Sequence, residues 1–232
     1  MTGDITKSFD FSIVVSPESL KSIDKFISSK YEIRKYTVET IDGASFLAKD
    51  ISEILEYTNP RARRIVKIEI TGRNGDWWCD KPSICFSLSE AFGFRNSVIY
   101  TLKNESEKDL DFSVKKLHEL VFPMKASYSW MLNKKFNFVL DVLGIAFPIT
   151  GFVLTRYLAY EKSFAIWLGV IVLIFWGLRW LVHILFPRAV FLIGQQVLWH
   201  EKIERRRIFV FEKTFWALIL SFVVSCVFFF FK

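Results

Sequence analysis

Hydrophobic and polar positions along the first 125 residues follow two periods, one typical of strands and one typical of amphipathic helices. Apolar side chains recur three or four residues apart near 17–29 and over 107–121, so each segment is expected to form a helix with one apolar face. Ser16 is a suitable N-cap for the first helix, and Pro17 is suited to its first turn. Both segments are therefore predicted to pack on a common core.

Runs rich in β-branched and aromatic residues predict strands in the rest of this region. The predicted strands cover residues 9–16, 31–39, 44–48, 64–71, 83–89 and 97–102. Asp50 is expected to cap a third, short helix over 51–57, and the Asn59-Pro60 step ends it. Strands mostly follow strands, which predicts an α+β domain with a mainly antiparallel sheet and about three helices on one of its faces.

Three long runs with few charges fill most of the chain after residue 135. Residues 136–155 and 164–186 carry one charge each and residues 214–231 carry none, over 20, 23 and 18 residues. As α-helices these runs are about 30, 34 and 27 Å long, close to the roughly 30 Å hydrocarbon core of a bilayer. The pattern predicts an all-α transmembrane region of three helices behind the N-terminal domain.

The charge distribution bears on partners and on orientation. The chain has 31 Lys+Arg and 24 Asp+Glu, but residues 1–130 hold 19 of each, so the whole excess lies beside the apolar runs. Basic residues at such places favour a lipid bilayer over nucleic acid as the partner. Lys134, Lys135 and the segment 187–213 are expected in the cytoplasm, with the C-terminus outside the cell inner membrane. The first ten residues have no apolar core typical of a signal peptide, so a cytoplasmic N-terminus is expected.

The predicted organisation is a cytosolic domain over 1–125, an interfacial junction over 126–135, two transmembrane helices, a basic cytoplasmic segment over 187–213 and the third transmembrane helix. Within the basic segment, Ala189–Ile193 is short, apolar and prone to β-structure. A helix is expected to begin near Gln195 and to run directly into the third apolar run.

Basic side chains beside the apolar runs are expected to contact lipid headgroups. They are Lys134, Lys135, Arg205, Arg206 and Arg207. An interfacial anchor is therefore the main interpretation of the segment 187–213. The alternatives are an elbow that gates the membrane region and a docking surface for the N-terminal domain.

Each apolar run places its small or polar residues on one helical face. The expected packing positions are Gly144, Gly151, Gly169, Ser221 and Ser225. Such stripes allow close helix packing within a chain or between copies, so a homo-oligomer is expected. Asp141 and Arg179 lie at similar depth, which predicts an intramembrane ion pair with His183 one turn away. Snorkelling of both charges to the headgroups is the alternative.

A predicted hairpin loop after Asn74-Gly75 is the main candidate for contact with a ligand or a cytosolic partner protein. Its candidate residues are Asp76, Trp77, Trp78 and Asp80. The alternative is a wide hairpin whose tryptophans pack on the sheet or enter the membrane interface. A cluster of three arginines in residues 59–67 is interpreted as the solvated start of a strand, and binding of a phosphate or an acidic headgroup is the alternative. These arginines are Arg61, Arg63 and Arg64.

The sequence contains no motif of a known reaction and no metal or cofactor set. We therefore expect a non-enzymatic membrane protein whose cytosolic sensing or partner-binding domain is coupled to an oligomeric transmembrane bundle. In its most specific form it is a membrane-permeability effector, a layout similar to that of small effectors in microbial defence. One alternative is a membrane anchor or assembly subunit that positions a cytosolic partner. Another is a membrane-surface enzyme that uses Asp76, Asp80 or His118.

Overall fold

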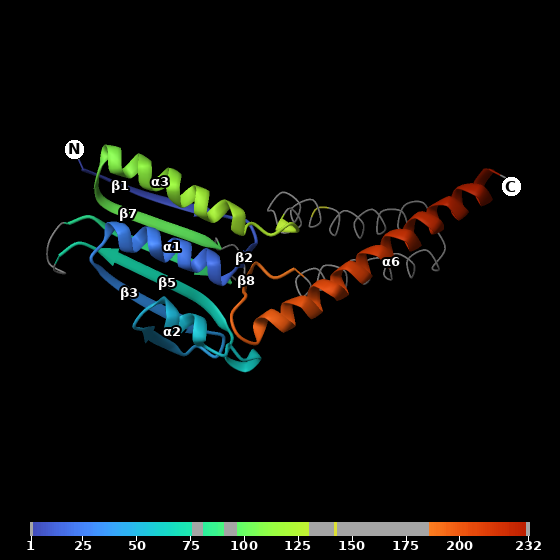
Figure 1. Cartoon of the computed structure of the whole chain (residues 1–232). Helices are drawn as coiled ribbons and strands as arrows, with labels where there is room; N and C mark the ends of the chain where they lie inside the picture. The colour runs from blue at the N-terminus through green and yellow to red at the C-terminus, as the bar shows by residue number, and fades with distance from the viewer. Residues whose placement is uncertain (1, 76–80, 91–96, 130–141, 143–185, 231–232) are drawn as a thin grey trace, which may run out of the picture.

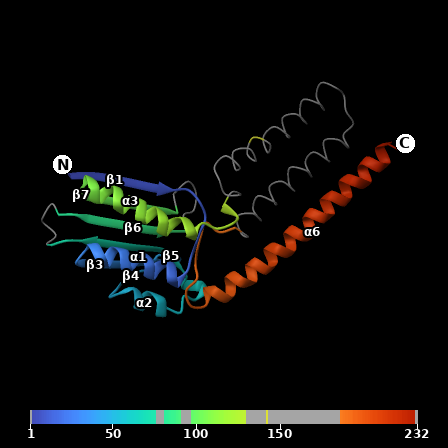
Figure 2. The ribbon, with the colours of Figure 1, turned by 45° about the horizontal axis from the view of Figure 1, so that its top comes forward.

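A computed structural model describes residues 2–75, 81–90, 97–129, 142 and 186–230. Within these ranges a twisted sheet carries helices on one face, and a long helix, α6, starts at one end of the sheet and extends away from it (Figure 1). A second view shows the helices α1 and α3 in one layer over the strands (Figure 2).

The large sheet has six strands and is antiparallel throughout. In spatial order its strands are β1 (Thr2–Phe9), β7 (Val98–Ser106), β6 (Ser83–Ser89), β5 (Ile65–Arg73), β3 (Ile33–Thr40) and β4 (Ser45–Ala48). Buried and half-buried positions alternate along β6, where Ile84, Phe86 and Leu88 belong to the core. This alternation is typical of a sheet with one face on a core and the other in solvent. The α+β class and the antiparallel sheet are thus confirmed.

The helices begin where the sequence supplies caps. They are α1 (Pro17–Lys30), α2 (Ile51–Glu56) and α3 (Glu107–Val121), with short 3-10 turns η1 (Arg61–Arg63) and η2 (Phe122–Met124). The side chains of Ser16, Asp50 and Ser106 each accept a hydrogen bond from a backbone N–H in the first turn of their helix. Because α1 contacts both α3 and α2, the three helices form one layer, as predicted (Figure 2).

The first strand differs from its prediction. A single run over 9–16 was expected, but the chain forms β1 (Thr2–Phe9) and, after a break, β2 (Ile13–Val15). β1 is an edge strand with mostly exposed positions, so its sequence lacks the apolar alternation that marks the central strands. β2 leaves the large sheet and pairs elsewhere, which is why the predicted run is divided.

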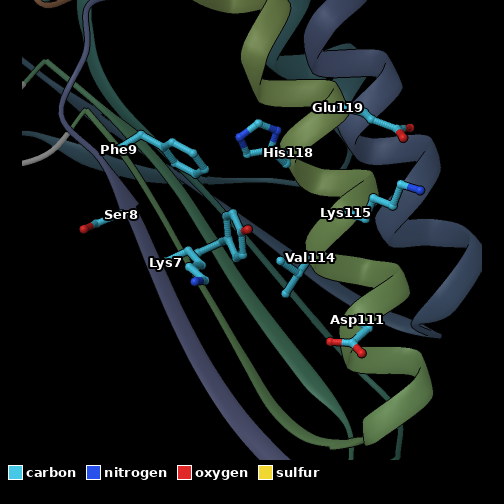
Figure 3. A pocket seen from close by; sticks show the side chains of 9 residues that line it. Lys7, Ser8, Phe9, Asp111, Val114, Lys115, His118 and Glu119 are labelled. Carbon is cyan, nitrogen blue, oxygen red and sulfur yellow. The ribbon is translucent and has the colours of Figure 1, made fainter.

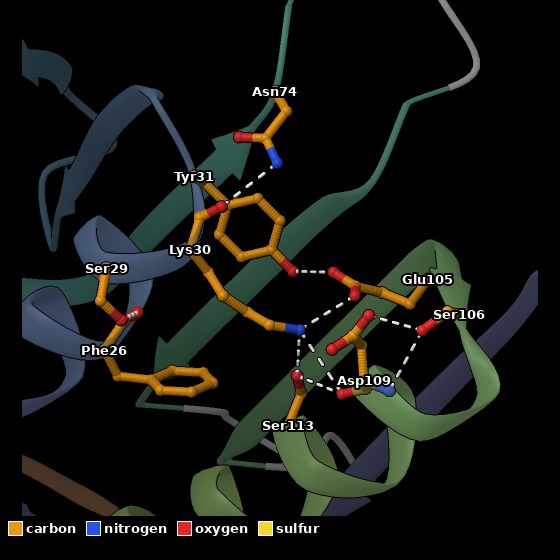
Figure 4. Close-up of polar contacts among 9 residues, drawn as sticks. All are labelled: Phe26, Ser29, Lys30, Tyr31, Asn74, Glu105, Ser106, Asp109 and Ser113. Atoms are coloured by element: carbon orange, nitrogen blue, oxygen red, sulfur yellow. Dashed lines mark hydrogen bonds and ion pairs between the residues drawn. The ribbon is translucent and has the colours of Figure 1, made fainter.

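A buried polar cluster ties α1, β7 and α3 together (Figure 4). Glu105 on β7 is 3% exposed and accepts hydrogen bonds from the Tyr31 hydroxyl and from Lys30 Nζ at 2.9 Å. Lys30 also donates to the Ser113 hydroxyl at 2.6 Å. Burial, followed by the hydrogen bond to Glu105, raises the pKa of Tyr31. A buried carboxylate with two donors is stabilised, whereas one deprived of a donor is costly, so this cluster fixes how the two helices sit on the sheet.

The C-terminal part returns to the domain before it departs. β8 (Ala189–Phe191) pairs with β2 as a parallel two-stranded sheet, and Ala189, Phe191 and Ile193 belong to the core cluster. The β-prone character expected at Ala189–Ile193 is thus confirmed for β8. The folded body extends beyond residue 125, because this segment is part of its core.

α6 spans Gln196–Phe230, which is 35 residues without a break. The expected helix that begins near Gln195 and continues into the last apolar run is confirmed as a continuous helix. In the part of the chain with described residues, no helix meets the length and apolarity needed to cross a membrane.

Candidate functional site

The segment 186–207 contacts the N-terminal domain at β2, at residues 57–60 and at residues 126–129. We call these four segments together the junction. Its centre is the parallel pairing of β2 with β8. Ile13 N–H donates to the Arg188 carbonyl at 2.8 Å, and Leu192 N–H donates to the Val15 carbonyl at 2.8 Å. The junction therefore joins the N-terminal domain to α6 through backbone hydrogen bonds.

Asn59, which follows α2 in the chain, is hydrogen-bonded to the start of α6. It is 0% exposed and has a positive φ of 47°, a conformation that asparagine tolerates better than most residues. Its carboxamide accepts from Ile65 N–H at 2.7 Å and donates to the Ile193 carbonyl at 3.3 Å. Its own carbonyl accepts from Gln196 Nε2 at 3.1 Å. One buried residue thus links β5, the end of β8 and the first turn of α6.

Gly194 allows the backbone before α6 to approach the backbone of residues 57–58 closely. Its φ is +53°, and a Cβ atom placed on it lies 2.3 Å from the Thr58 carbonyl oxygen and 2.7 Å from that of Tyr57. The following residue, Gln195, donates its N–H to the Thr58 carbonyl at 2.9 Å. Only glycine satisfies both the left-handed conformation and the close approach at this point.

Arg207 closes the junction about one turn further along α6 than Ile203. Its guanidinium carbon lies 4.2 Å from the ring centroid of Tyr128 and 5.1 Å from that of Phe186, and the residue is 7% exposed. Tyr128 donates to the Pro187 carbonyl at 3.1 Å, and burial raises its pKa to about 12. Arg205 and Arg206 are exposed. The structure therefore separates Arg207 from the expected group of headgroup contacts and leaves the other two in that prediction.

His200 lies between these contacts on α6. It is 9% exposed, and burial lowers its pKa from the ordinary value of 6.5. Its Nε2 lies 3.7 Å from a Glu204 oxygen, and its Nδ1 finds no partner among the described residues. A neutral imidazole at this buried position favours a closed junction, because protonation adds a charge that is poorly solvated.

A second feature is a solvent-open cleft between β1 and α3, with a volume of about 660 Å³ (Figure 3). Phe9 and Lys7 line it from β1, Tyr100 from β7, and His118 and Lys115 from α3. The Phe9 ring faces the His118 ring at a centroid distance of 5.6 Å. The cleft therefore combines aromatic rings with basic side chains.

Many residues that the sequence marked lie outside the described residues, so their predictions stay as made. They are Asp76, Trp77, Trp78, Asp80, Lys134, Lys135, Asp141, Gly144, Gly151, Gly169, Arg179 and His183. Ser221 and Ser225 lie on α6, where only the backbone is described. The Asn74-Gly75 hairpin signal does lie between the paired strands β5 and β6.

The arginine cluster is divided by its partners. Arg64 binds Glu90 in a bidentate manner, with Arg64 Nη2 2.9 Å from Glu90 Oε1, and it is largely buried. Arg63 lies 3.2 Å from Asp42. Arg64 is thus engaged within the chain, which agrees with the interpretation of this segment as the start of a strand.

Among the described residues, His118 contacts aromatic rings. Its ring lies between those of Phe9 and Phe122, at centroid distances of 5.6 and 5.8 Å. Across the described ranges, no group of three or more His, Cys, Asp or Glu side chains is arranged to hold a metal ion.

A docking surface for the N-terminal domain was one alternative for the segment 187–213, and the structure shows this contact, but sequence reasoning did not identify its partners on the domain. The Asn59-Pro60 step was interpreted as the end of a helix, and Ala189–Ile193 was noted as β-prone before Gly194. Nothing local indicates that these two segments meet. Comparisons with protein-family models, curated proteins and solved structures found no match for this chain.

Proposed function

We propose that this chain is an integral membrane protein whose cytoplasmic α+β domain controls the permeability of an oligomeric transmembrane bundle. The runs 136–155, 164–186 and 214–231 form the bundle in this proposal, because their lengths suit a bilayer. The main support for the proposal is the continuity of α6. This helix is held to the domain by the hydrogen bonds of the junction and extends without a break into the last apolar run.

A continuous helix transmits motion well. α6 has 35 residues and is therefore about 52 Å long at 1.5 Å per residue. A small change in angle at its first turn displaces its far end by many times the local shift. The junction fastens that first turn through Asn59, Gly194 and the β2–β8 pair, so a change within the domain is passed to the helix rather than absorbed by a loop.

The predicted stripes of small and polar residues support an oligomer with interior polar positions. Asp141 and Arg179 are proposed to pair within or between subunits, because either charge alone is costly in hydrocarbon, about 2.5–3.5 kcal/mol on insertion scales. If they pair, Asp141→Asn and Arg179→Gln each impair assembly, and the exchange Asp141→Arg with Arg179→Asp restores it. An exchange as harmful as the single changes contradicts the pairing.

The proposal is tested by two measurements on the full chain. The mass of the particle in nanodiscs gives its oligomeric state, and dye entry into expressing cells gives permeability. The proposal expects a discrete oligomer, carbonate-resistant membrane association and dye entry. A monomer or dimer with tight membranes overturns it and favours the anchor that positions a cytosolic partner.

The role of the junction is tested with a matched pair of variants. Gly194→Ala places a Cβ against the Thr58 backbone, whereas Gly43→Ala introduces alanine at a similar positive φ of +82° with open space around it. Coupling predicts that dye entry changes with Gly194→Ala and not with Gly43→Ala, at equal membrane levels. Equal dye entry for both variants contradicts control of the bundle through α6.

A further inference from the structure

A tyrosine hydroxyl opens on the cleft between β1 and α3. Tyr100 is 1% exposed and lines the cleft, and burial raises its pKa. Among the described residues no hydrogen bond reaches the Tyr100 hydroxyl, and solvent in the cleft reaches its oxygen. A hydroxyl that is free to donate at the edge of a cavity is available to a ligand.

A lysine lies on the strand beside Tyr100. Lys7 on β1 is the direct cross-strand partner of Tyr100 on β7, so both side chains are on the same face of the sheet. No ion pair of Lys7 exists within the described ranges. A neutral O–H donor beside an ammonium group is suited to an acidic oxygen.

The acids of the cleft have cations beside them. Glu119 lies 3.2 Å from Lys116, and Asp111 is one helical turn from Lys115 on α3. Within the described ranges, Lys7 forms no ion pair. Three lysines at or beside the cleft, Lys7, Lys115 and Lys116, accompany two carboxylates, Asp111 and Glu119, so the local net charge is positive.

The walls of the cleft are suited to a flat ring. Phe9 lies 6.0 Å from Tyr100 and 5.6 Å from His118, centroid to centroid, and the planes of the Phe9 and His118 rings differ by 54°. Figure 3 shows Phe9 and His118 at the same end of the cleft, Phe9 on the strand side and His118 on the helix. Aromatic rings pack favourably at such distances. The cavity volume of about 660 Å³ lies in the range of small-molecule sites, roughly 300–1,000 Å³.

We propose that this cleft binds a small planar aromatic anion. The ring of the ligand packs against Phe9 and His118, and its acidic group lies between the Tyr100 hydroxyl and the Lys7 ammonium. Binding of such a ligand is independent of the function proposed above. Its consequence for the membrane region rests on that function.

Both walls of the cleft lead into the junction. β1 ends at Phe9 and is followed by β2, while α3 is followed by residues that contact β2. Ala126 N–H donates to the Ser12 carbonyl at 2.8 Å, and Ser12 N–H donates to the Ser129 hydroxyl at 3.1 Å. A ligand that changes the spacing of β1 and α3 therefore acts on β2 and on residues 126–129, the two segments of the junction that follow these elements.

The test uses the full chain in nanodiscs and fluorine NMR of three probes. 4-Fluorobenzoate is planar and anionic, 4-fluorobenzamidine is planar and cationic, and a fluorinated cyclohexanecarboxylate is anionic without a planar ring. Empty nanodiscs correct for partition into lipid. We expect 4-fluorobenzoate to bind with a dissociation constant on the order of 1 mM, as suits a fragment of this size. The other two probes are expected to bind at least fivefold more weakly.

Variants locate the site. Tyr100→Phe keeps the ring and removes the donor, so it is expected to weaken 4-fluorobenzoate about tenfold, as for a hydrogen bond to a charged group. Lys7→Gln is expected to weaken it about threefold to tenfold, and less at high salt. Lys103→Gln is the control, because Lys103 is exposed on β7 at a position of opposite parity to Tyr100.

The proposal is overturned if 4-fluorobenzoate does not bind above the empty-nanodisc level, if the cationic probe binds equally well, or if Tyr100→Phe and Lys103→Gln bind alike. Dye entry is measured separately in cells that express the same variants, without a probe. If the probe binds but the protein does not permeabilise membranes, the ligand site is supported and the proposed function is refuted. If the protein permeabilises membranes but the probe does not bind, only the ligand site is refuted.

Discussion

The close backbone contact at Gly194 leads to the sharpest prediction about the junction. Gly194→Ala forces a non-glycine residue to a φ of +53°, which costs about 1–2 kcal/mol. The new Cβ also lies 2.3 Å from the Thr58 carbonyl oxygen, so the backbone at residues 57–58 has to move. That shift breaks the hydrogen bonds from Gln195 N–H to Thr58 and from Gln196 Nε2 to Asn59, worth about 1 kcal/mol each. The junction is expected to lose about 3–4 kcal/mol in total.

Hydrogen–deuterium exchange of the full chain in nanodiscs measures this loss locally. Gly43→Ala has a similar positive φ with nothing within 4 Å of the new Cβ, so it carries only the conformational cost. The difference between the variants, about 2 kcal/mol, corresponds to about 30-fold faster exchange in the peptides that contain Gln195. If Gly194→Ala exchanges there no faster than Gly43→Ala, the reasoning from close contact is refuted.

Three further predictions concern buried polar groups. Tyr31→Phe removes a donor from buried Glu105 and is expected to lower the free energy of unfolding, measured in urea, by about 1.5–3 kcal/mol. Tyr100→Phe breaks no hydrogen bond and is expected to lower it by less than about 0.5 kcal/mol. Equal losses for the two variants contradict this reasoning. Asn59→Ala leaves the buried Ile65 N–H without its side-chain acceptor and removes one of the two donors to the Ile193 carbonyl, which also accepts from Gln196 N–H. It is expected to expose the start of α6 to protease, at a cost of about 1–3 kcal/mol, and unchanged cleavage counts against it. Burial lowers the pKa of His200, so the unfolded state binds a proton more readily than the folded state does. Thermal stability is therefore expected to be full above about pH 6.5 and to fall below it. His200→Gln is expected to flatten this pH dependence.

The elements that could be predicted from sequence are those with local causes. α1 and α3 have serine caps, one apolar face and a clear start, and their predicted bounds agree closely with the structure. β6 alternates strictly because one face is in the core, and it was predicted at Ser83–Ser89. β1 could not be predicted, because an edge strand with polar positions on both sides has no alternation to detect.

The residues that pair within the junction could not be predicted for a different reason, although docking of the segment 187–213 on the N-terminal domain was one of the alternatives. β2 and β8 are three residues each, too short to carry a period, and they form only because their partners lie far along the chain. Arg207 was grouped with Arg205 and Arg206 by position, yet the aromatic rings that surround it come from Tyr128 and Phe186. The unpaired Tyr100 hydroxyl likewise follows from packing, since no pattern in β7 distinguishes it from other core tyrosines.

The parallel pairing of β2 with β8 also bears on biosynthesis. Asp10 and Arg188, which form an ion pair at 3.1 Å beside this pairing, are 178 residues apart. A ribosome that adds roughly 5–20 residues per second needs about 10–35 s between these two points. Once residue 106 has been made, all strands of the large sheet are present, but the core still lacks Ala189, Phe191 and Ile193. The nascent domain therefore has β2 without its partner strand until β8 has left the ribosome.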